Sequence, residues 1–140
     1  MSIEALELAR DNAKLNNAEV AFIHANILNE KLNFSGNNKF DVIVSNPPYV
    51  RTQDQDQMKP NVLNYEPHLA LFVEDNDPLK FFSAICKFAF TNLKNEGLLY
   101  FEINEFLGIQ VKKLLQEHDF KNIELRKDVY NKNRMIKATK

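Results

Sequence analysis

The sequence predicts an α/β fold, with a mostly parallel sheet that carries helices on its faces. Helical and strand-like segments alternate along the chain, which is typical of parallel sheets. The run FDVIVS at residues 40–45 is almost entirely apolar, as a central parallel strand covered on both faces would be. The last two strand-like segments are separated by only three residues, which adds an antiparallel hairpin at one edge of the predicted sheet.

The first expected elements are a helix and a short strand. Residues 2–16 predict the helix, because Ser2 suits the N-cap, Glu4 suits the first turn, and Ala5 and Ala9 lie on one face. An apolar run too short for a helix follows, and we expect a strand at residues 20–24. The polar segment at residues 33–39 predicts a loop, and the strand at 40–45 comes next.

The second half of the chain predicts one long loop and five regular elements. Residues 50–78 contain several prolines and little periodicity, and a loop of that length in a compact domain is usually functional. After it we expect two helices and three strands: a helix at 79–93, a strand at 97–103, a helix at 106–118, and closing strands at 123–129 and 133–139.

Composition indicates one domain of an ordinary globular protein, spanning residues 1–140. The net charge of −1 and the pI of about 6.3 give no basic footprint, so we expect no direct binding to nucleic acid. We see no signal peptide and no long apolar span, which predicts a cytoplasmic protein without membrane contact. The three histidines are too scattered for a metal site, and Cys86 is expected to be a buried helical thiol.

The sequence NPPY at residues 46–49 stiffens the backbone where a strand ends. Each proline fixes its own φ and biases the preceding residue towards an extended conformation. The side-chain oxygen of Asn46 and the backbone oxygen of Pro47 then form a rigid pair of acceptors, which suits a planar NH₂ group. Tyr49 offers an aromatic face for the same group. Such a site positions an amide or aromatic amine for attack on an electrophile without a titrating base.

Four segments together resemble the release-factor glutamine methyltransferases (the HemK/PrmC family). These segments are SNPPYV, NYEPHLALF at 64–72, the helix SIEALELARDNA, and the closing hairpin LRKDVYNKNRMIKA, and EGLLYFEIN fits the strand between them. The resemblance covers essentially the whole chain. It implies a Rossmann-like class I methyltransferase fold that lacks the first two strands, and methyl transfer from S-adenosylmethionine to the glutamine of the Gly-Gly-Gln motif in class I peptide-chain release factors, which act in translation termination.

The resemblance also implies roles for single residues. Asn46 and Pro47 would grip the glutamine amide, with Pro48 and Tyr49 packed beside it as the rest of the catalytic and substrate-binding turn. Glu66 and Pro67 would shape the substrate side of the site. Asn26, with Ile27 beside it, falls where the family has an acidic residue near the adenine of the cofactor, which Asn46 would also contact. Asn104 and Asn131 stand where the family has glycine, and we expect both to be tolerated, since asparagine accepts left-handed backbone conformations.

One part of the family pattern is missing from this sequence. The family has an N-terminal helical domain and a glycine-rich cofactor loop, whereas this chain has only three glycines, none of them in such a loop. We therefore expect a partial S-adenosylmethionine-dependent domain that binds the cofactor weakly or not at all and is inactive alone. The missing strands would leave a hydrophobic strand edge unpaired, which predicts a homo-oligomer.

Two alternative functions and the role of one residue remain open on the sequence. An amino-adenine methyltransferase of DNA or RNA would use the same NPPY chemistry, but the near-neutral charge and the YEP segment argue against it. A non-catalytic fragment that serves as an interaction or folding module is the second. For Glu102, which ends a strand close to the expected site, a structural hydrogen bond and a substrate contact are equally open.

Overall fold

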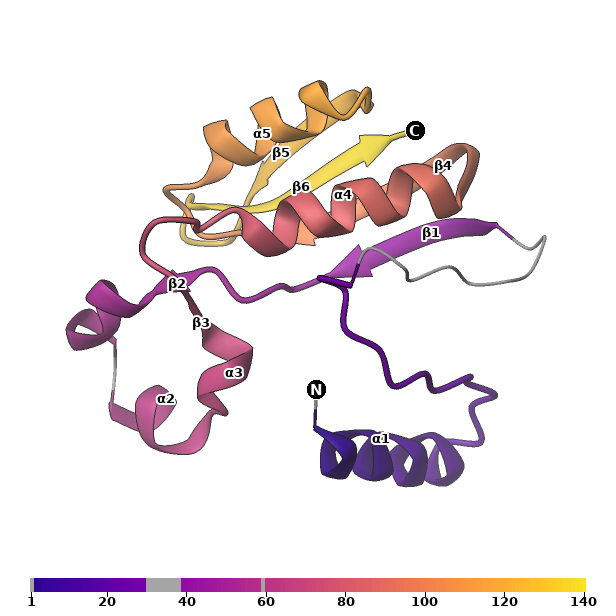
Figure 1. Ribbon diagram of the computed structural model, residues 1–140, viewed down its shortest axis with the longest axis vertical. Coiled ribbons are helices and arrows are strands. Elements are labelled where there is room, and N and C mark those ends of the chain that lie inside the picture. Colours follow the sequence, from indigo (N-terminus) through magenta and orange to yellow (C-terminus); the bar gives the residue numbers. More distant parts are fainter. Residues whose placement is uncertain (1, 30–38, 59) are drawn as a thin grey trace. The chain divides into compact units, whose positions relative to one another are not determined.

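The computed structural model describes residues 2–29, 39–58 and 60–140. The chain divides into two compact units, residues 1–33 and residues 34–140. Figure 1 shows the chain coloured along its sequence, with the helices and strands labelled.

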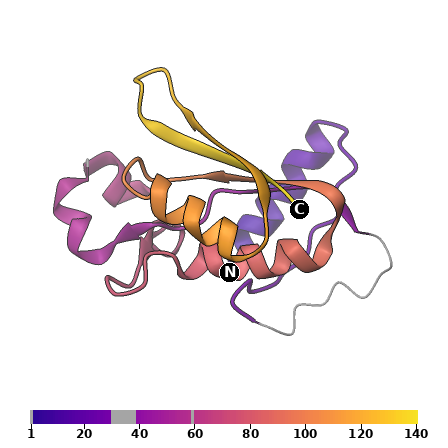
Figure 2. The ribbon, with the colours of Figure 1, turned by 90° about the horizontal axis from the view of Figure 1, so that it is seen from above.

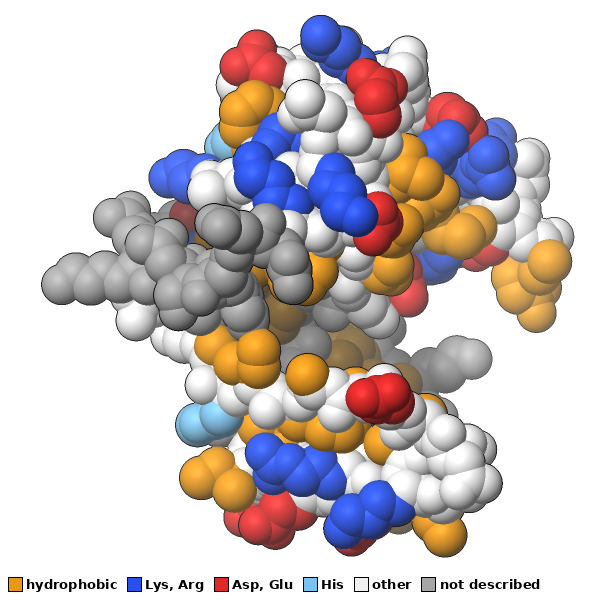
Figure 3. Space-filling model, turned by 90° about the vertical axis from the view of Figure 1, so that its right-hand side faces the viewer, with side chains coloured by type: hydrophobic (Ala, Val, Ile, Leu, Met, Phe, Trp, Pro, Cys, Tyr) orange, Lys and Arg blue, Asp and Glu red, His pale blue; other side chains and the backbone are white. Residues whose placement is uncertain are grey.

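The first unit contains one helix, α1 (Ile3–Leu15). Its N-terminus is capped as expected, because the Ser2 hydroxyl accepts a hydrogen bond from the Ala5 backbone N–H at 3.1 Å. No residue of α1 is buried, and hydrophobic side chains lie at its surface (Figure 3). The guanidinium of Arg10, on the helix, lies 5.9 Å from the ring centre of Phe22, in the segment that follows the helix, at cation–π distance.

The prediction of a strand at residues 20–24 is wrong. This segment has no regular secondary structure, and the side chains of Val20 and Ile23 are each 52% exposed. A strand needs a neighbour to pair with its backbone N–H and C=O groups, and the strand pairings of the described residues do not include this segment. The apolar pattern is present in the sequence, but it is not sufficient without a partner strand.

The second unit is built on a four-stranded sheet. Its strands are β1 (Phe40–Ser45), β4 (Leu93–Glu102), β6 (Asn133–Thr139) and β5 (Lys121–Lys127), in the spatial order β1-β4-β6-β5. β1 and β4 are parallel, and β6 is antiparallel to both β4 and β5. Three of the four strands therefore run in the same direction, and the expected sheet with a C-terminal antiparallel hairpin is confirmed (Figure 1).

Helices α4 (Lys80–Asn92) and α5 (Gly108–Glu117) cover one face of this sheet, and the β5–β6 hairpin extends away from them (Figure 2). The core lies between helices and sheet, where the ring of Phe82 packs edge-on against Phe101 with centroids 5.1 Å apart. Leu99 and Phe101 point to this covered face, since both are almost completely buried. Alternate residues of β1 point the other way, and Val44 is 73% exposed.

β4 begins four residues earlier than the expected strand, at Leu93 instead of residue 97. The extra residues carry an irregularity, because Glu96 adopts a left-handed φ of 62° and the register with β1 shifts here. Gly97 is required at this point: a Cβ added to it would lie 2.9 Å from the backbone oxygen of Lys94. The bend explains why the sequence pattern indicates only the regular part of the strand.

The segment from residue 50 to residue 78 is not an irregular loop. It contains two short strands, a 3-10 helix and two short helices: β2 (Val50–Arg51), η1 (Thr52–Gln57), α2 (Pro60–Tyr65), α3 (His68–Leu71) and β3 (Phe72–Val73). Pro60 is the first residue of α2, and Pro67 is the N-cap residue of α3. Proline is well accepted at the start of a helix, so prolines that suggest a loop mark two helix starts here.

The hairpin turn between β5 and β6 is held by one aspartate. The Oδ1 atom of Asp128 accepts hydrogen bonds from the backbone N–H groups of Tyr130 and Lys132, at 2.9 and 3.1 Å. Asn131 adopts a φ of 63°, which confirms that asparagine takes the left-handed position in this turn. Asn104 is different, because it is not among the residues with positive φ and its side chain instead accepts from the Phe106 N–H at 2.9 Å.

Candidate active site

The NPPY turn lies at the carboxyl end of β1, where functional groups gather in open α/β sheets. Ser45 pairs with Phe101 of β4, so the turn begins beside the end of the neighbouring strand. The side chain of Asn46 is exposed, whereas Pro47 is buried. A buried proline anchors the turn, and the polar side chain before it stays available for binding.

Tyr49 is tied to the end of β4. Its hydroxyl donates a hydrogen bond to Oε1 of Glu102 at 3.2 Å, across 53 residues of sequence. Partial burial and the negative charge of Glu102 raise the pKa of Tyr49 above its ordinary value, and the nearby Arg134 opposes this rise. Tyr49 therefore stays a neutral phenol that donates to the carboxylate.

Arg134 extends this contact to the β5–β6 hairpin. Its backbone oxygen accepts a hydrogen bond from the N–H of Ile103 at 2.9 Å, and its Nε lies 3.4 Å from Oδ2 of Asp128. Partial desolvation opposes the charge of Arg134, but the hydrogen bond with Asp128 and the negative charges of Asp128 and Glu102 outweigh it and raise the pKa of Arg134. Sequence reasoning did not single out Asp128 and Arg134 as site residues, although both are matched letters of the family's K-D-x-x-G-x-x-R hairpin.

The YEP segment is joined to the NPPY turn through a small second sheet. β2, which follows Tyr49 directly, pairs in parallel with β3, which follows α3. The hydroxyl of Thr52 donates to the backbone oxygen of Val73 at 3.2 Å, and the Gln53 N–H donates to Oδ1 of Asp75 at 2.9 Å. These contacts fix both ends of the segment that carries Glu66 and Pro67.

Glu66 and Pro67 are exposed in the link between α2 and α3. The Glu66 N–H donates to the Val62 oxygen at 3.0 Å, so the backbone of the link is held while the carboxylate stays in solvent. His68 packs its ring edge-on against Phe72 at 5.3 Å, which is a packing role. Contact of Glu66 and Pro67 with a substrate stays a prediction.

Asn26 and Ile27, the two further residues expected at the cofactor, belong to the first unit. Oδ1 of Asn26 accepts a hydrogen bond from the Leu28 N–H at 3.0 Å, which closes a local turn, and Ile27 is half-buried. The amide of Asn26 is exposed, so its remaining donors and acceptors are open to solvent. The contact of either residue with an adenine also stays a prediction.

The residues present fit the reacting methyl group of S-adenosylmethionine better than they fit the rest of the cofactor. An exposed Asn46 at a strand end is a suitable neighbour for a reacting methyl group. A glycine-rich loop for the rest of the cofactor is missing from the sequence, and the two described glycines serve packing instead. The Cβ positions of Gly97 and Gly108 are filled by Leu93 and Leu125, not by free space.

Other side-chain chemistry is sparse. Across residues 2–29, 39–58 and 60–140 there is no cluster of three or more histidine, cysteine, aspartate or glutamate side chains that could hold a metal ion. Cys86 is fully buried in α4, as expected, and burial raises the pKa of its thiol to about 12. Among these residues no helix combines the length and apolar character needed to cross a membrane.

Comparison with known proteins places this arrangement in a family. Residues 3–137 match the family model described as Eco57I restriction-modification methylase. A release factor glutamine methyltransferase from Flavobacterium psychrophilum is 51% identical over 138 residues, which are 99% of this chain and 47% of that protein. Another from Bacteroides thetaiotaomicron is 36% identical over 140 residues, which are 100% of this chain and 50% of that protein.

A solved structure supports the fold. The crystal structure of a methyltransferase from Pyrococcus furiosus superposes with a TM-score of 0.67 at 18% identity, covering 99% of this chain and 59% of that one. The chain spans about half the length of the curated relatives named above. The resemblance to release-factor glutamine methyltransferases and the Rossmann-like methyltransferase fold are thereby confirmed. The chain belongs to the Eco57I restriction-modification methylase family, and the two relatives described above, which align with nearly all of its 140 residues, are named release factor glutamine methyltransferases.

Proposed function

We propose that this chain carries the acceptor side of an enzyme that methylates a glutamine side-chain amide. The substrate is the glutamine of the Gly-Gly-Gln motif in class I peptide-chain release factors, and S-adenosylmethionine is the methyl donor. The observation that carries the proposal is the NPPY turn itself. Asn46 is exposed at the end of a parallel strand, and Tyr49 beside it is held by Glu102. The names of the relatives support glutamine as the group that such a turn binds.

The chain's own residues would bind and orient the amide. The side-chain oxygen of Asn46 and the backbone oxygen of Pro47 accept its two hydrogens, which aims the nitrogen lone pair away from them. S-adenosylmethionine, when bound, supplies an electrophilic methyl group attached to a sulfonium. The two acceptors also stabilise the positive charge that develops on the nitrogen, and one of the two hydrogens that they hold is then lost to solvent as a proton. The phenol of Tyr49 remains protonated, so it packs beside the amide as a neutral ring.

We propose further that this chain alone binds S-adenosylmethionine weakly or not at all, and is inactive by itself. The missing glycine-rich loop supports this, since backbone N–H groups of such a loop usually bind the charged part of the cofactor. Calorimetric titration of the 140-residue chain with S-adenosylmethionine checks it. A dissociation constant in the micromolar range would contradict the proposal.

The identity of the substrate is tested by transfer of a labelled methyl group in the complete protein. We expect label in a release factor, located by peptide mass spectrometry on the glutamine of Gly-Gly-Gln, and none in a release factor with asparagine at that position. A duplex oligonucleotide that contains adenine serves as the competing substrate. Label on the oligonucleotide would instead favour an amino-adenine methyltransferase, the alternative that the names of the relatives do not favour.

We also propose that β1 pairs with a second copy of this chain. β1 is the edge strand of the described sheet, and its side chains Val42 and Val44 are exposed on the face opposite to the helices. An exposed apolar edge strand favours pairing with another strand. Light scattering over a range of concentrations is expected to show a dimer or larger oligomer. A monomer at the highest concentration would contradict this.

A further inference from the structure

Tyr49 needs support from outside the NPPY turn to keep its ring in place. The residue is half-buried, and it is followed by β2 and not by a long strand that would fix it. A tyrosine side chain has two torsions with more than one allowed rotamer, so packing on one side alone leaves its ring several orientations. A planar amide bound beside this ring requires one orientation only.

The support comes from the ends of the two neighbouring strands of the main sheet. Glu102 is the last residue of β4, directly after Phe101, which pairs with Ser45 at the end of β1. Because β1 and β4 are parallel, their carboxyl ends lie at the same edge, and Oε1 of Glu102 accepts the Tyr49 hydroxyl at 3.2 Å.

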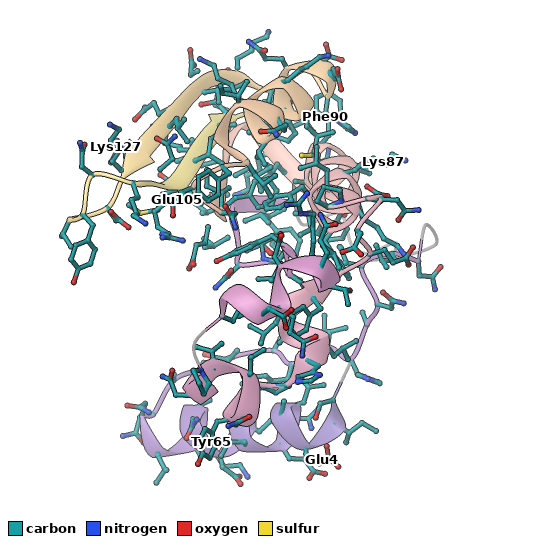
Figure 4. The ribbon with its side chains drawn as sticks, turned by 90° about the vertical axis from the view of Figure 1, so that its left-hand side faces the viewer. Glu4, Tyr65, Lys87, Phe90, Glu105 and Lys127 are labelled. Carbon is teal, nitrogen blue, oxygen red and sulfur yellow. The ribbon has the colours of Figure 1, made fainter. Side chains whose placement is uncertain are left out.

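A charged side chain of the neighbouring strand β6 lies close to this pair. Arg134 lies on β6, next to Met135, which pairs with Glu102, and the charge of Arg134 acts on both Glu102 and Tyr49. The guanidinium is itself directed by Asp128 at 3.4 Å, in the turn where the hairpin protrudes. Figure 4 shows Lys127, next to that aspartate, on this protruding hairpin.

We propose that Glu102 is a positioning residue that fixes the Tyr49 ring through its hydroxyl. This inference rests on the proposed function, because it assigns Tyr49 a fixed ring beside the bound amide. It resolves the two roles left open for Glu102 in favour of a structural hydrogen bond.

The first test measures Tyr49 without any activity. In protein labelled with ¹³C at the tyrosine Cζ carbon, a pH titration followed by NMR reports the pKa of each phenol. We expect Glu102→Gln to lower the pKa of Tyr49, since a negative charge is removed, and Arg134→Gln to raise it further. Glu117→Gln, a surface change on α5, is the control. A Tyr49 titration that Glu102→Gln leaves unchanged would overturn the proposal.

The second test measures methyl transfer in the complete protein. We expect Glu102→Ala to lower kcat between roughly tenfold and a hundredfold with little change in KM, the usual range for losing a hydrogen bond to a charged group. Glu102→Gln, which still accepts from a phenol, should retain most of the rate. In a Tyr49→Phe background, Glu102→Ala should add nothing, because the hydroxyl that it supports is already absent.

The outcomes separate this inference from the proposed function. Full additivity of Glu102→Ala and Tyr49→Phe would show that Glu102 acts independently of Tyr49, and the inference would be wrong. If the wild-type protein methylates neither a release factor nor an oligonucleotide, the proposed function fails, whereas the titration still decides the Glu102–Tyr49 contact. Tyr130→Phe at the exposed hairpin turn is the matched hydroxyl deletion, and it should change neither readout.

Discussion

Replacement of Phe101 by leucine tests the packing that places the candidate site at the sheet edge. Phe101 lies in β4 immediately before Glu102 and pairs with Ser45, immediately before Asn46. Its side chain is only 2% exposed and packs edge-on against Phe82 at 5.1 Å. Phe101 therefore belongs to the core and is adjacent, in sequence and in strand register, to the two strand ends that form the site.

The size of the effect follows from these contacts. Loss of an edge-to-face aromatic pair costs about 0.5–1.5 kcal/mol beyond the area that the rings bury. A leucine also fills less volume than a phenylalanine, and the remaining cavity adds a further cost in a site that cannot collapse freely. We therefore expect Phe101→Leu to lower the free energy of unfolding by about 1–2 kcal/mol.

Urea unfolding followed by circular dichroism measures this change, with Phe90→Leu as the matched control. Phe90 also makes an edge-on aromatic contact, with Phe120 at 5.9 Å, but it is 39% exposed. Phe90→Leu should lower the free energy of unfolding by less than Phe101→Leu does, since water can occupy part of the space that is left. Equal losses for the two variants, or a larger loss for Phe90→Leu, would refute the packing argument.

Three more predictions follow from local contacts. Gly97→Ala should cost about 1–3 kcal/mol in urea unfolding, because the new Cβ meets a backbone oxygen at 2.9 Å; Gly108→Ala, which meets a leucine side chain that can rotate, should cost less. Cys86 should resist a thiol reagent at pH 8 in the folded protein and react on unfolding, and rapid native-state labelling would contradict its burial. Hydrogen bonds from the turn backbone and Arg134 lower the pKa of Asp128, so its contribution to stability is present above the ordinary aspartate pKa and is lost as the pH falls through the lowered value. In NMR, the backbone N–H of Lys132 should titrate with the same midpoint, and an independent midpoint would contradict the contact.

The parts of the fold that were predicted correctly are those governed by local chemistry. The strand at 40–45 is observed with the expected bounds, and α4 and α5 lie within one or two residues of theirs. Periodic apolar residues determine these elements, and the NPPY turn follows from the conformational limits of proline. The exposed Asn46 at the strand end was therefore predictable from the sequence alone.

The parts that were missed depend on contacts between distant residues. β2 and β3 have two residues each, which is too short to show any periodicity, and they form only because they pair with each other. The hydrogen bond from Tyr49 to Glu102 depends on the register of β1 with β4, which no local pattern specifies. The segment at residues 20–24 shows the reverse case, an apolar pattern without a paired strand.

The central claim is that the NPPY turn holds a planar amide through the side chain of Asn46, and Asn46→Ala tests it most directly. In the complete protein, single-turnover methylation of a release factor should slow by roughly a hundredfold or more, as expected when one preorganised polar contact to the reacting group is lost. Asn104→Ala, on the loop after β4, is the matched control and should keep most of the rate. A wild-type rate in Asn46→Ala, with the methyl group still mapped to the same glutamine, would contradict the account.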